Sequence, residues 1–217
     1  CDWSSDVCSS DLGTRCRNSC PRHGPRSCVD HEAIQERVFA EAAGLGWIGK
    51  NTCLIHPQLG SWLFLGDILT NAALEPDAPL PDQCGTCTRC IDACPTEAIH
   101  RPVGPNGTEP YSIDATRCLS YLTIETRGEI DPALQPAVAT QIFGCDICQD
   151  VCPWNRTAAV SDDPAWQPRE ALRFPRLADL VAMSDAEWSA AMKGSAMKRA
   201  GLTRIRRTLR YAQAARG

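Results

Sequence analysis

The sequence predicts an α+β fold in three parts, and three observations support this prediction. A stretch with helical periodicity and then a short apolar stretch typical of a strand precede residue 74. Eight of the fourteen cysteines lie within residues 84–152. A polar and then basic stretch with helix signals ends the sequence. With 217 residues, 43% of them hydrophobic, and a net charge of −4, the chain can bury a core in one or two domains.

The first 27 residues give no prediction of structure. Residues 1–12 resemble translated sequencing-adapter read-through, and residues 13–27 are rich in Arg, Cys and Pro without periodicity. We therefore expect structured protein to begin near Cys28 and the natural protein to begin well upstream.

A helix is predicted to follow Asp30. Ile34, Val38 and Ala42 recur at four-residue steps and predict one apolar face. Asp30 stands where an N-cap is expected, and Gly44 stands where the helix should end. From the residues alone, Asp30 is a helix cap.

Residues 44–51 match two nucleotide-binding patterns, and we reject both. The patterns G-x-G-x-x-G and G-x-x-x-x-G-K must follow a strand and open a helix, whereas this stretch follows a predicted helix. Asn51 also replaces the Ser or Thr that would bind magnesium. The glycines instead predict close approach of the backbone to something large and flat.

A buried strand with a kink at Gly66 is predicted for Ser61–Thr70, which is apolar and aromatic. Residues 74–83 contain three prolines and predict a linker into the cysteine-rich part of the chain. A Pro/Gly loop is expected at residues 101–110.

The eight clustered cysteines form two linked iron–sulfur motifs. The first is the bacterial run C-x2-C-x2-C-x3-C-P at residues 84–95, whose fourth cysteine normally binds the other cluster. The second repeats the C-x2-C-x3-C-P half at residues 145–153, with Cys118 as its displaced first member. By this exchange rule, the predicted ligand sets of the two [4Fe–4S] clusters are Cys84, Cys87, Cys90 and Cys152 for one, and Cys94, Cys118, Cys145 and Cys148 for the other.

Zinc and disulfides explain the cysteines less well. Zinc also takes paired C-x2-C thiolates, but it has no use for a third close cysteine or for two Cys-Pro endings. Disulfides belong to oxidising compartments, and the sequence has neither the apolar segment of a signal peptide nor a run approaching membrane length. We therefore expect a cytoplasmic protein without membrane association.

The C-terminal part is predicted to be helical and basic. Ser184 and Glu187 form a capping-box pattern, and Lys193-Gly194 ends that helix. From Lys193 onward there are eight Lys or Arg residues and no Asp or Glu. Such a run is either a solvated helix face or a contact with a phosphate backbone, and both readings stay open.

Two low-potential clusters form a path for single electrons, so the residues support two function classes. One is a ferredoxin-like electron carrier, and the other is a redox enzyme whose clusters feed a second cofactor. A carrier has no need of residues 30–70 or of a basic helical end, which favours the enzyme.

The blocks that flank the cysteines carry a family resemblance. They include A-G-L-G-W-I-G-K-N-T at residues 43–52, G-S-W-L-F-L-G at 60–66, C-L-S-Y-L-T-I-E at 118–125 and G-C-D-I-C-Q-D-V-C-P-W-N at 144–155. Together these blocks closely resemble the epoxyqueuosine reductases over about residues 28–210. The family's N-terminal region is missing, so we expect an N-terminally truncated chain.

The resemblance implies the last step of queuosine synthesis. Family members reduce the epoxide of epoxyqueuosine in the tRNA anticodon stem-loop to queuosine, using cobalamin and two [4Fe–4S] clusters. An external low-potential electron donor and a monomer are expected. The alternatives are a ferredoxin-like electron-transfer protein and a corrinoid iron–sulfur reductase of another small electrophile.

The resemblance also assigns roles and domains. Asp30 matches the family's proposed proton donor. Cobalamin contacts are expected from Lys50, Asn51, Ser61 and Trp62, for which core or turn packing is the alternative. Contacts with tRNA phosphates are expected from Lys198, Arg199, Arg204, Arg206, Arg207 and Arg210. The expected parts are an artefact or unstructured segment (1–27), a remnant of the cobalamin-binding domain (28–81), the cluster module (82–157) and a helical basic region (158–217).

Overall fold

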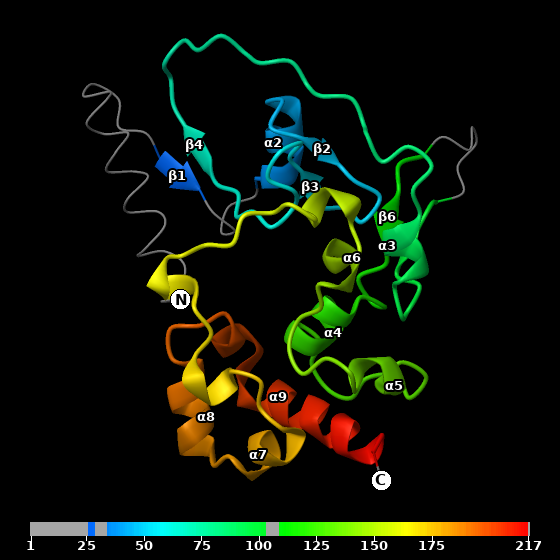
Figure 1. Cartoon of the computed structure of the whole chain (residues 1–217), viewed down its shortest axis with the longest axis vertical. Coiled ribbons are helices and arrows are strands. Elements are labelled where there is room, and N and C mark those ends of the chain that lie inside the picture. The colour runs from blue at the N-terminus through cyan, green and yellow to red at the C-terminus, as the bar shows by residue number, and fades with distance from the viewer. Residues whose placement is uncertain (1–25, 29–33, 103–108, 217) are drawn as a thin grey trace. The chain divides into compact units, whose positions relative to one another are not determined.

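The computed structural model describes residues 26–28, 34–102 and 109–216, which fall into two compact units. Unit 1 consists of the described residues up to Cys87 together with Pro153–Ala158. Unit 2 consists of Thr88–Cys152 and the chain from Ala159 onward (Figure 1). Within the described ranges, every helix is too short or too polar to cross a membrane.

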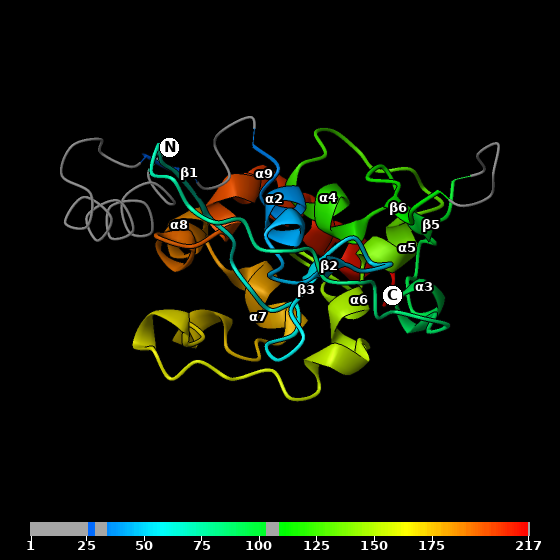
Figure 2. The same cartoon turned by 90° about the horizontal axis from the view of Figure 1, so that it is seen from above.

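Unit 1 is built on a small hairpin. β2 (Trp47–Ile48) pairs antiparallel with β3 (Leu54–Ile55), and helix α2 (Glu36–Ala42) packs against both strands (Figures 1 and 2). The hairpin supplies the buried side chains of Trp47, Leu54 and Ile55. A second antiparallel pair joins β1 (Arg26–Cys28) to β4 (Asp67–Leu69), and the 3-10 turn η1 spans Pro153–Asn155.

The predicted helix after Asp30 is wrong in its start and in its buried face. α2 begins at Glu36 with Gln35 as its N-cap, and Asp30 itself lies outside the described residues. Ala40 is buried, whereas Val38 is 47% exposed. A seven-residue helix is marginal alone, so packing on the hairpin decides which face is buried. The predicted end is confirmed, because Gly44 follows the helix with φ +70°.

The predicted strand over Ser61–Thr70 is much shorter than expected. Only Asp67–Leu69 is a strand, and it pairs with β1, most of which lies in the segment for which we made no structural prediction. Ser61 is buried, but Phe64 is 79% exposed. An apolar segment becomes a strand only where a partner offers backbone hydrogen bonds, and β1 offers three residues.

Unit 2 is mostly helical, with one short hairpin. The hairpin pairs β5 (Ile99–His100) with β6 (Ser112–Ile113). The helices are α3 (Arg89–Asp92), α4 (Leu119–Ile124), α5 (Gln135–Val138), α6 (Ile147–Asp150), α7 (Leu177–Ala182), α8 (Asp185–Met192) and α9 (Met197–Ala214). Two 3-10 turns, η2 (Pro164–Trp166) and η3 (Glu170–Leu172), precede α7.

The basic C-terminal segment is part of the core of unit 2. α9 packs against α4, α5, α7 and α8 (Figures 1 and 2). Its Ile205 and Leu209 join Trp188 in one buried cluster, and its Tyr211 joins Leu122 in another. The solvated face is therefore only one side of an amphipathic helix.

The predicted capping box is confirmed at the start of α8. The Ser184 hydroxyl accepts a hydrogen bond from the Glu187 N–H, and the Glu187 carboxylate accepts one from the Ser184 N–H at 2.7 Å. These reciprocal bonds satisfy two backbone donors at the helix start. The helix also ends where predicted, with Lys193 as its C-cap.

Candidate metal centre

Four cysteines predicted to share one cluster all lie in unit 2. Cys94 follows α3, Cys118 is the N-cap of α4, Cys145 lies just before α6, and Cys148 lies within it. Burial raises the pKa of the Cys145 thiol, and the nearby thiols of Cys148 and Cys118 raise it further. The fold thus brings Cys118, Cys145 and Cys148 into one neighbourhood.

The Cys94 sulfur lies among hydrogen-bond donors. The Ala98 N–H donates to Sγ at 3.3 Å, and the Oγ1 atom of the buried Thr96 lies 3.7 Å from Sγ. Burial acts to raise the pKa of Cys94, but hydrogen bonds from Thr96, Ala98 and Ile99 together hold it below its usual value. The site favours the thiolate, which is the form that binds iron.

The other predicted ligand set begins in a tight loop of unit 1. The Cys87 N–H donates to the Cys84 carbonyl at 3.1 Å, and the Asp82 carboxylate accepts from the Cys84 N–H at 2.7 Å. Lys50, which comes from the β2–β3 connection, donates from Nζ to the Cys87 carbonyl at 2.8 Å. No sequence motif indicates this lysine contact.

The remaining two members of that set lie in unit 2. Cys90 is part of α3, and the buried Cys152 follows α6. α3 and α6 pack against each other, so these two segments are neighbours within the unit.

The donor set fits iron–sulfur clusters. The nine cysteines whose side chains the structure describes form no disulfide. Among the described residues, no group of three His, Cys, Asp or Glu side chains converges on a single metal-ion position. A [4Fe–4S] cluster does not need its ligands to converge on one metal position, because each iron binds one cysteine and the four cysteines surround the cluster.

The residues expected to contact cobalamin do not form an open polar site. Lys50 donates to loop carbonyls, and the buried Asn51 accepts a hydrogen bond from the Cys53 N–H at 3.3 Å. Ser61 is also buried and is bound to Asn155. Trp62 is 43% exposed and could contact a ligand. Three of these four side chains are thus hydrogen-bonded within unit 1, so the four do not fit a set of polar contacts open to a cofactor.

The basic residues of α9 are mostly engaged within unit 2. Arg207 is 4% exposed and donates to the carbonyls of Leu122, Thr126 and Gly128, so the prediction that it meets tRNA phosphate is wrong. Its guanidinium instead joins α9 to the end of α4 and the chain after it.

The other basic residues differ in exposure and pairing. Arg206 donates to the Met183 carbonyl and to Asp185, and Arg204 donates to the Ala200 carbonyl. Ion pairs also join Arg199 to Glu125 and Arg210 to Glu129, both with exposed guanidinium groups. Lys198 is exposed.

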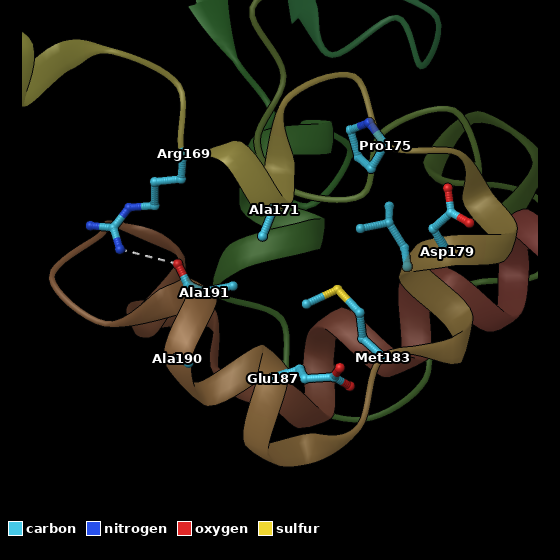
Figure 3. A pocket seen from close by; sticks show the side chains of 9 residues that line it. Arg169, Ala171, Pro175, Asp179, Met183, Glu187, Ala190 and Ala191 are labelled. Atoms are coloured by element: carbon cyan, nitrogen blue, oxygen red, sulfur yellow. Dashed lines mark hydrogen bonds between the residues drawn. The ribbon is translucent and has the colours of Figure 1, made fainter.

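A surface hollow of about 560 Å³ lies between η3, α7 and α8 in unit 2 (Figure 3). Two of its polar side chains already have partners: Arg169 donates to the Ala191 carbonyl at 3.2 Å, and Glu187 belongs to the capping box of α8. Its lining residues include none of the predicted cluster cysteines. The hollow is therefore separate from the candidate centre.

Comparison with known proteins supports a double [4Fe–4S] domain and shows which proteins the chain resembles. A family described as a 4Fe-4S double cluster binding domain matches residues 83–155. The epoxyqueuosine reductase of Salmonella typhimurium is 41% identical over 93% of this chain, and that of Synechocystis is 46% identical over 84%. The chain is therefore similar to the epoxyqueuosine reductases over most of its length. It covers 50% and 61% of those two proteins, so it spans about half the length of the curated relatives it matches.

Solved epoxyqueuosine reductases share the fold. One, determined with an epoxyqueuosine-modified tRNA stem loop, has a TM-score of 0.82 at 32% identity. Another, from Streptococcus thermophilus, has a TM-score of 0.75 at 29% identity. Each comparison covers 95% of this chain and 52% of the solved epoxyqueuosine reductase. These matches confirm the family resemblance and the double [4Fe–4S] domain, while the individual ligand assignments stay predictions.

Proposed function

We propose that the protein to which this chain belongs is an epoxyqueuosine reductase, which converts epoxyqueuosine in tRNA to queuosine. The observation that carries the proposal is the fold shared with an epoxyqueuosine reductase solved with an epoxyqueuosine-modified tRNA stem loop. The conversion of an epoxide to an alkene takes two electrons and two protons and releases water. The protein must therefore bring electron transfer and proton donation together.

The eight predicted cysteines carry the electron-transfer part of this proposal. When bound, the two clusters supply single electrons at low potential. The donors around Cys94 stabilise its thiolate, and burial of Cys152 limits water at its sulfur. An external low-potential donor reduces the clusters, and Asp30 is the proposed proton donor, by resemblance to the family.

Cobalamin belongs to the proposal through the resemblance alone. Trp62 is the one expected contact whose side chain is markedly exposed. We derive no chemical step from cobalamin, because Lys50, Asn51 and Ser61 bind other parts of unit 1. We further propose a cytoplasmic monomer.

Conversion of modified tRNA is the direct test. The protein carrying this chain, at the full length of its relatives, is reconstituted anaerobically with iron, sulfide and cobalamin and supplied with a chemical reductant. Nucleoside mass spectrometry should then detect queuosine from epoxyqueuosine-containing tRNA, and a Cys145→Ser protein should form far less. Intact clusters and bound corrinoid without conversion would contradict the proposal and favour another small electrophile as substrate.

The tRNA contact has its own test. Lys198 is exposed, so Lys198→Ala should weaken tRNA binding and reduce the salt slope by roughly 0.7–0.9. Arg176→Ala removes an exposed cation outside the basic run and serves as the control. Equal effects of the two substitutions would argue against a specific role for Lys198.

A further inference from the structure

Lys50 connects the hairpin of unit 1 to the first cysteine loop. Its ammonium donates to the Gly85 carbonyl at 2.7 Å and to the Cys87 carbonyl at 2.8 Å, across 35 and 37 residues of sequence. Both acceptors lie in the loop that carries Cys84 and Cys87, two predicted ligands of the same cluster. One side chain therefore fixes two points of a ligand-bearing loop.

The backbone that presents Lys50 is itself held firmly. The Gly49 N–H donates to the Cys53 carbonyl at 2.9 Å, and the Thr52 N–H donates to the Gly49 carbonyl at 2.8 Å. A Cβ on the buried Gly49 would lie 2.5 Å from the Ile55 side chain, so this position accepts only glycine without rearrangement. Lys50 thus extends from a closed turn whose geometry is set by the hairpin.

The same hairpin also holds the chain that follows Cys152. The rings of Trp47 and Trp154 meet edge to face, with centroids 4.9 Å apart and planes at 75°. Pro153 directly follows Cys152 in the sequence, so this ring contact restrains the segment next to a third predicted ligand of that cluster. Residues 47–55 therefore contact both the loop that carries Cys84 and Cys87 and the segment that follows Cys152.

The charge on Lys50 has an electrical consequence as well. Reduction adds negative charge to a cluster that already carries thiolate ligands, so a nearby cation favours the reduced state. Lys50 is only half-buried, and solvent weakens its field.

We propose that Lys50 positions the Cys84–Cys87 loop and raises the reduction potential of the cluster that this loop binds. The inference rests on the proposed two-cluster electron path and adds a residue that tunes it. It gives Lys50 a role in addition to the predicted contact with cobalamin, since the Gly85 and Cys87 carbonyls that accept its hydrogen bonds belong to the cluster loop.

The test compares three substitutions in the reconstituted full-length protein. Lys50→Met removes the charge and keeps much of the length, Lys50→Arg keeps the charge, and Lys198→Met removes an exposed lysine from α9. Reductive titration followed by electron paramagnetic resonance measures the midpoint potential of each cluster, and an iron assay counts the clusters.

We expect Lys50→Met to shift one of the two midpoints to a more negative value by about 59 mV, which is a tenfold change in the one-electron equilibrium. Lys50→Arg should largely restore the midpoint, and Lys198→Met should leave both midpoints unchanged. Loss of roughly four of eight irons in Lys50→Met alone would also support the proposal, because it shows a failure to position one cluster.

Unchanged midpoints with full iron content in Lys50→Met would overturn the proposal. Loss of all iron would overturn it too, since the effect would then be general and not confined to one cluster. Failure of the underlying function is separate, because it would appear in the unsubstituted protein as missing iron or as no conversion of tRNA.

Discussion

Asn155 and Ser61 lie 94 residues apart in the sequence and bind each other through two hydrogen bonds. The Ser61 N–H donates to Asn155 Oδ1 at 2.7 Å, and Asn155 Nδ2 donates to Ser61 Oγ at 2.9 Å. The pair joins the end of the second cysteine motif to the segment before β4, within unit 1. It explains why an asparagine follows the Cys-Pro-Trp sequence.

Asn155→Ala should destabilise the protein by about 2 kcal/mol, because it leaves the buried Ser61 N–H without this acceptor. Asn155→Asp should cost less, since the carboxylate keeps the acceptor and loses only the donor. Denaturant unfolding measures both changes. Asn71→Ala, at an exposed position, is the control and should have little effect. A stability equal to that of the control would contradict the role of Asn155.

Gly60→Ala should destabilise the protein more than Gly128→Ala does. Both glycines have positive φ, +75° and +80°, which costs an alanine about 1–2 kcal/mol. At Gly60 a Cβ would also lie 2.1 Å from Asn155 Oδ1, whereas nothing lies within 4 Å at Gly128. Thermal unfolding of the two variants should therefore separate the steric effect from the backbone effect. Equal losses of stability would show that Asn155 does not crowd Gly60.

Arg207→Met should destabilise unit 2 by about 3 kcal/mol. The guanidinium donates to the carbonyls of Leu122 and Gly128 at 2.6 Å and of Thr126 at 2.8 Å. All three carbonyls lose this donor together, and the Thr126 carbonyl keeps a longer bond from Arg204 Nε at 3.3 Å. Arg207→Lys should restore little, because an ammonium lacks the planar fork of donors. Arg216→Met, at an exposed position just after α9, is the matched control in urea unfolding. Unfolding of Arg207→Met at the control's urea concentration would refute this structural role.

Cys145→Ser should reduce the iron content of the reconstituted protein from about eight to about four per chain, because it removes one ligand of one predicted cluster. Cys53→Ser should retain about eight irons, since Cys53 belongs to neither predicted ligand set. An iron assay on anaerobically purified protein makes the comparison. If Cys53→Ser also lost half of its iron, the ligand assignment would need revision.

Glu129 should make stability depend on pH in the acid range. Hydrogen bonds from Tyr211 and then Arg210 hold the pKa of its carboxyl below the ordinary value of 4.5. The folded state therefore prefers the carboxylate, and its stabilising contribution is present above about pH 4.5 and is lost as pH falls through the lower folded pKa.

The substitution Glu129→Gln tests this dependence. The variant should unfold more easily than the unsubstituted protein near neutral pH, and the difference should shrink as pH falls below the ordinary carboxyl pKa. Glu75→Gln, at an exposed position between β4 and the first cysteine loop, should show no such convergence. A Glu129→Gln difference that stays constant with pH would refute the assigned role of the carboxylate.

Interactions between residues close together in the sequence explain the predictions that are confirmed. The cysteine spacing identified the double cluster domain because neighbouring ligands must lie a few residues apart to reach one cluster. The capping box at Ser184 was correct because its two partners lie three residues apart, and Gly44 ended its helix because its φ is positive.

Contacts between residues far apart in the sequence explain the predictions that the structure corrects. α2 starts late and buries Ala40 because of the hairpin on which it packs, and the predicted strand is short because β1 pairs with only three of its residues. A basic pattern describes charge and not burial, so it could not show that Arg207 binds carbonyls as far as 85 residues away. The sequence by itself predicted the cluster ligands and the resemblance to the epoxyqueuosine reductases, because both depend on short motifs. Only the tertiary structure decided that Lys50 holds a cluster loop, because that contact needs the hairpin and the loop folded together.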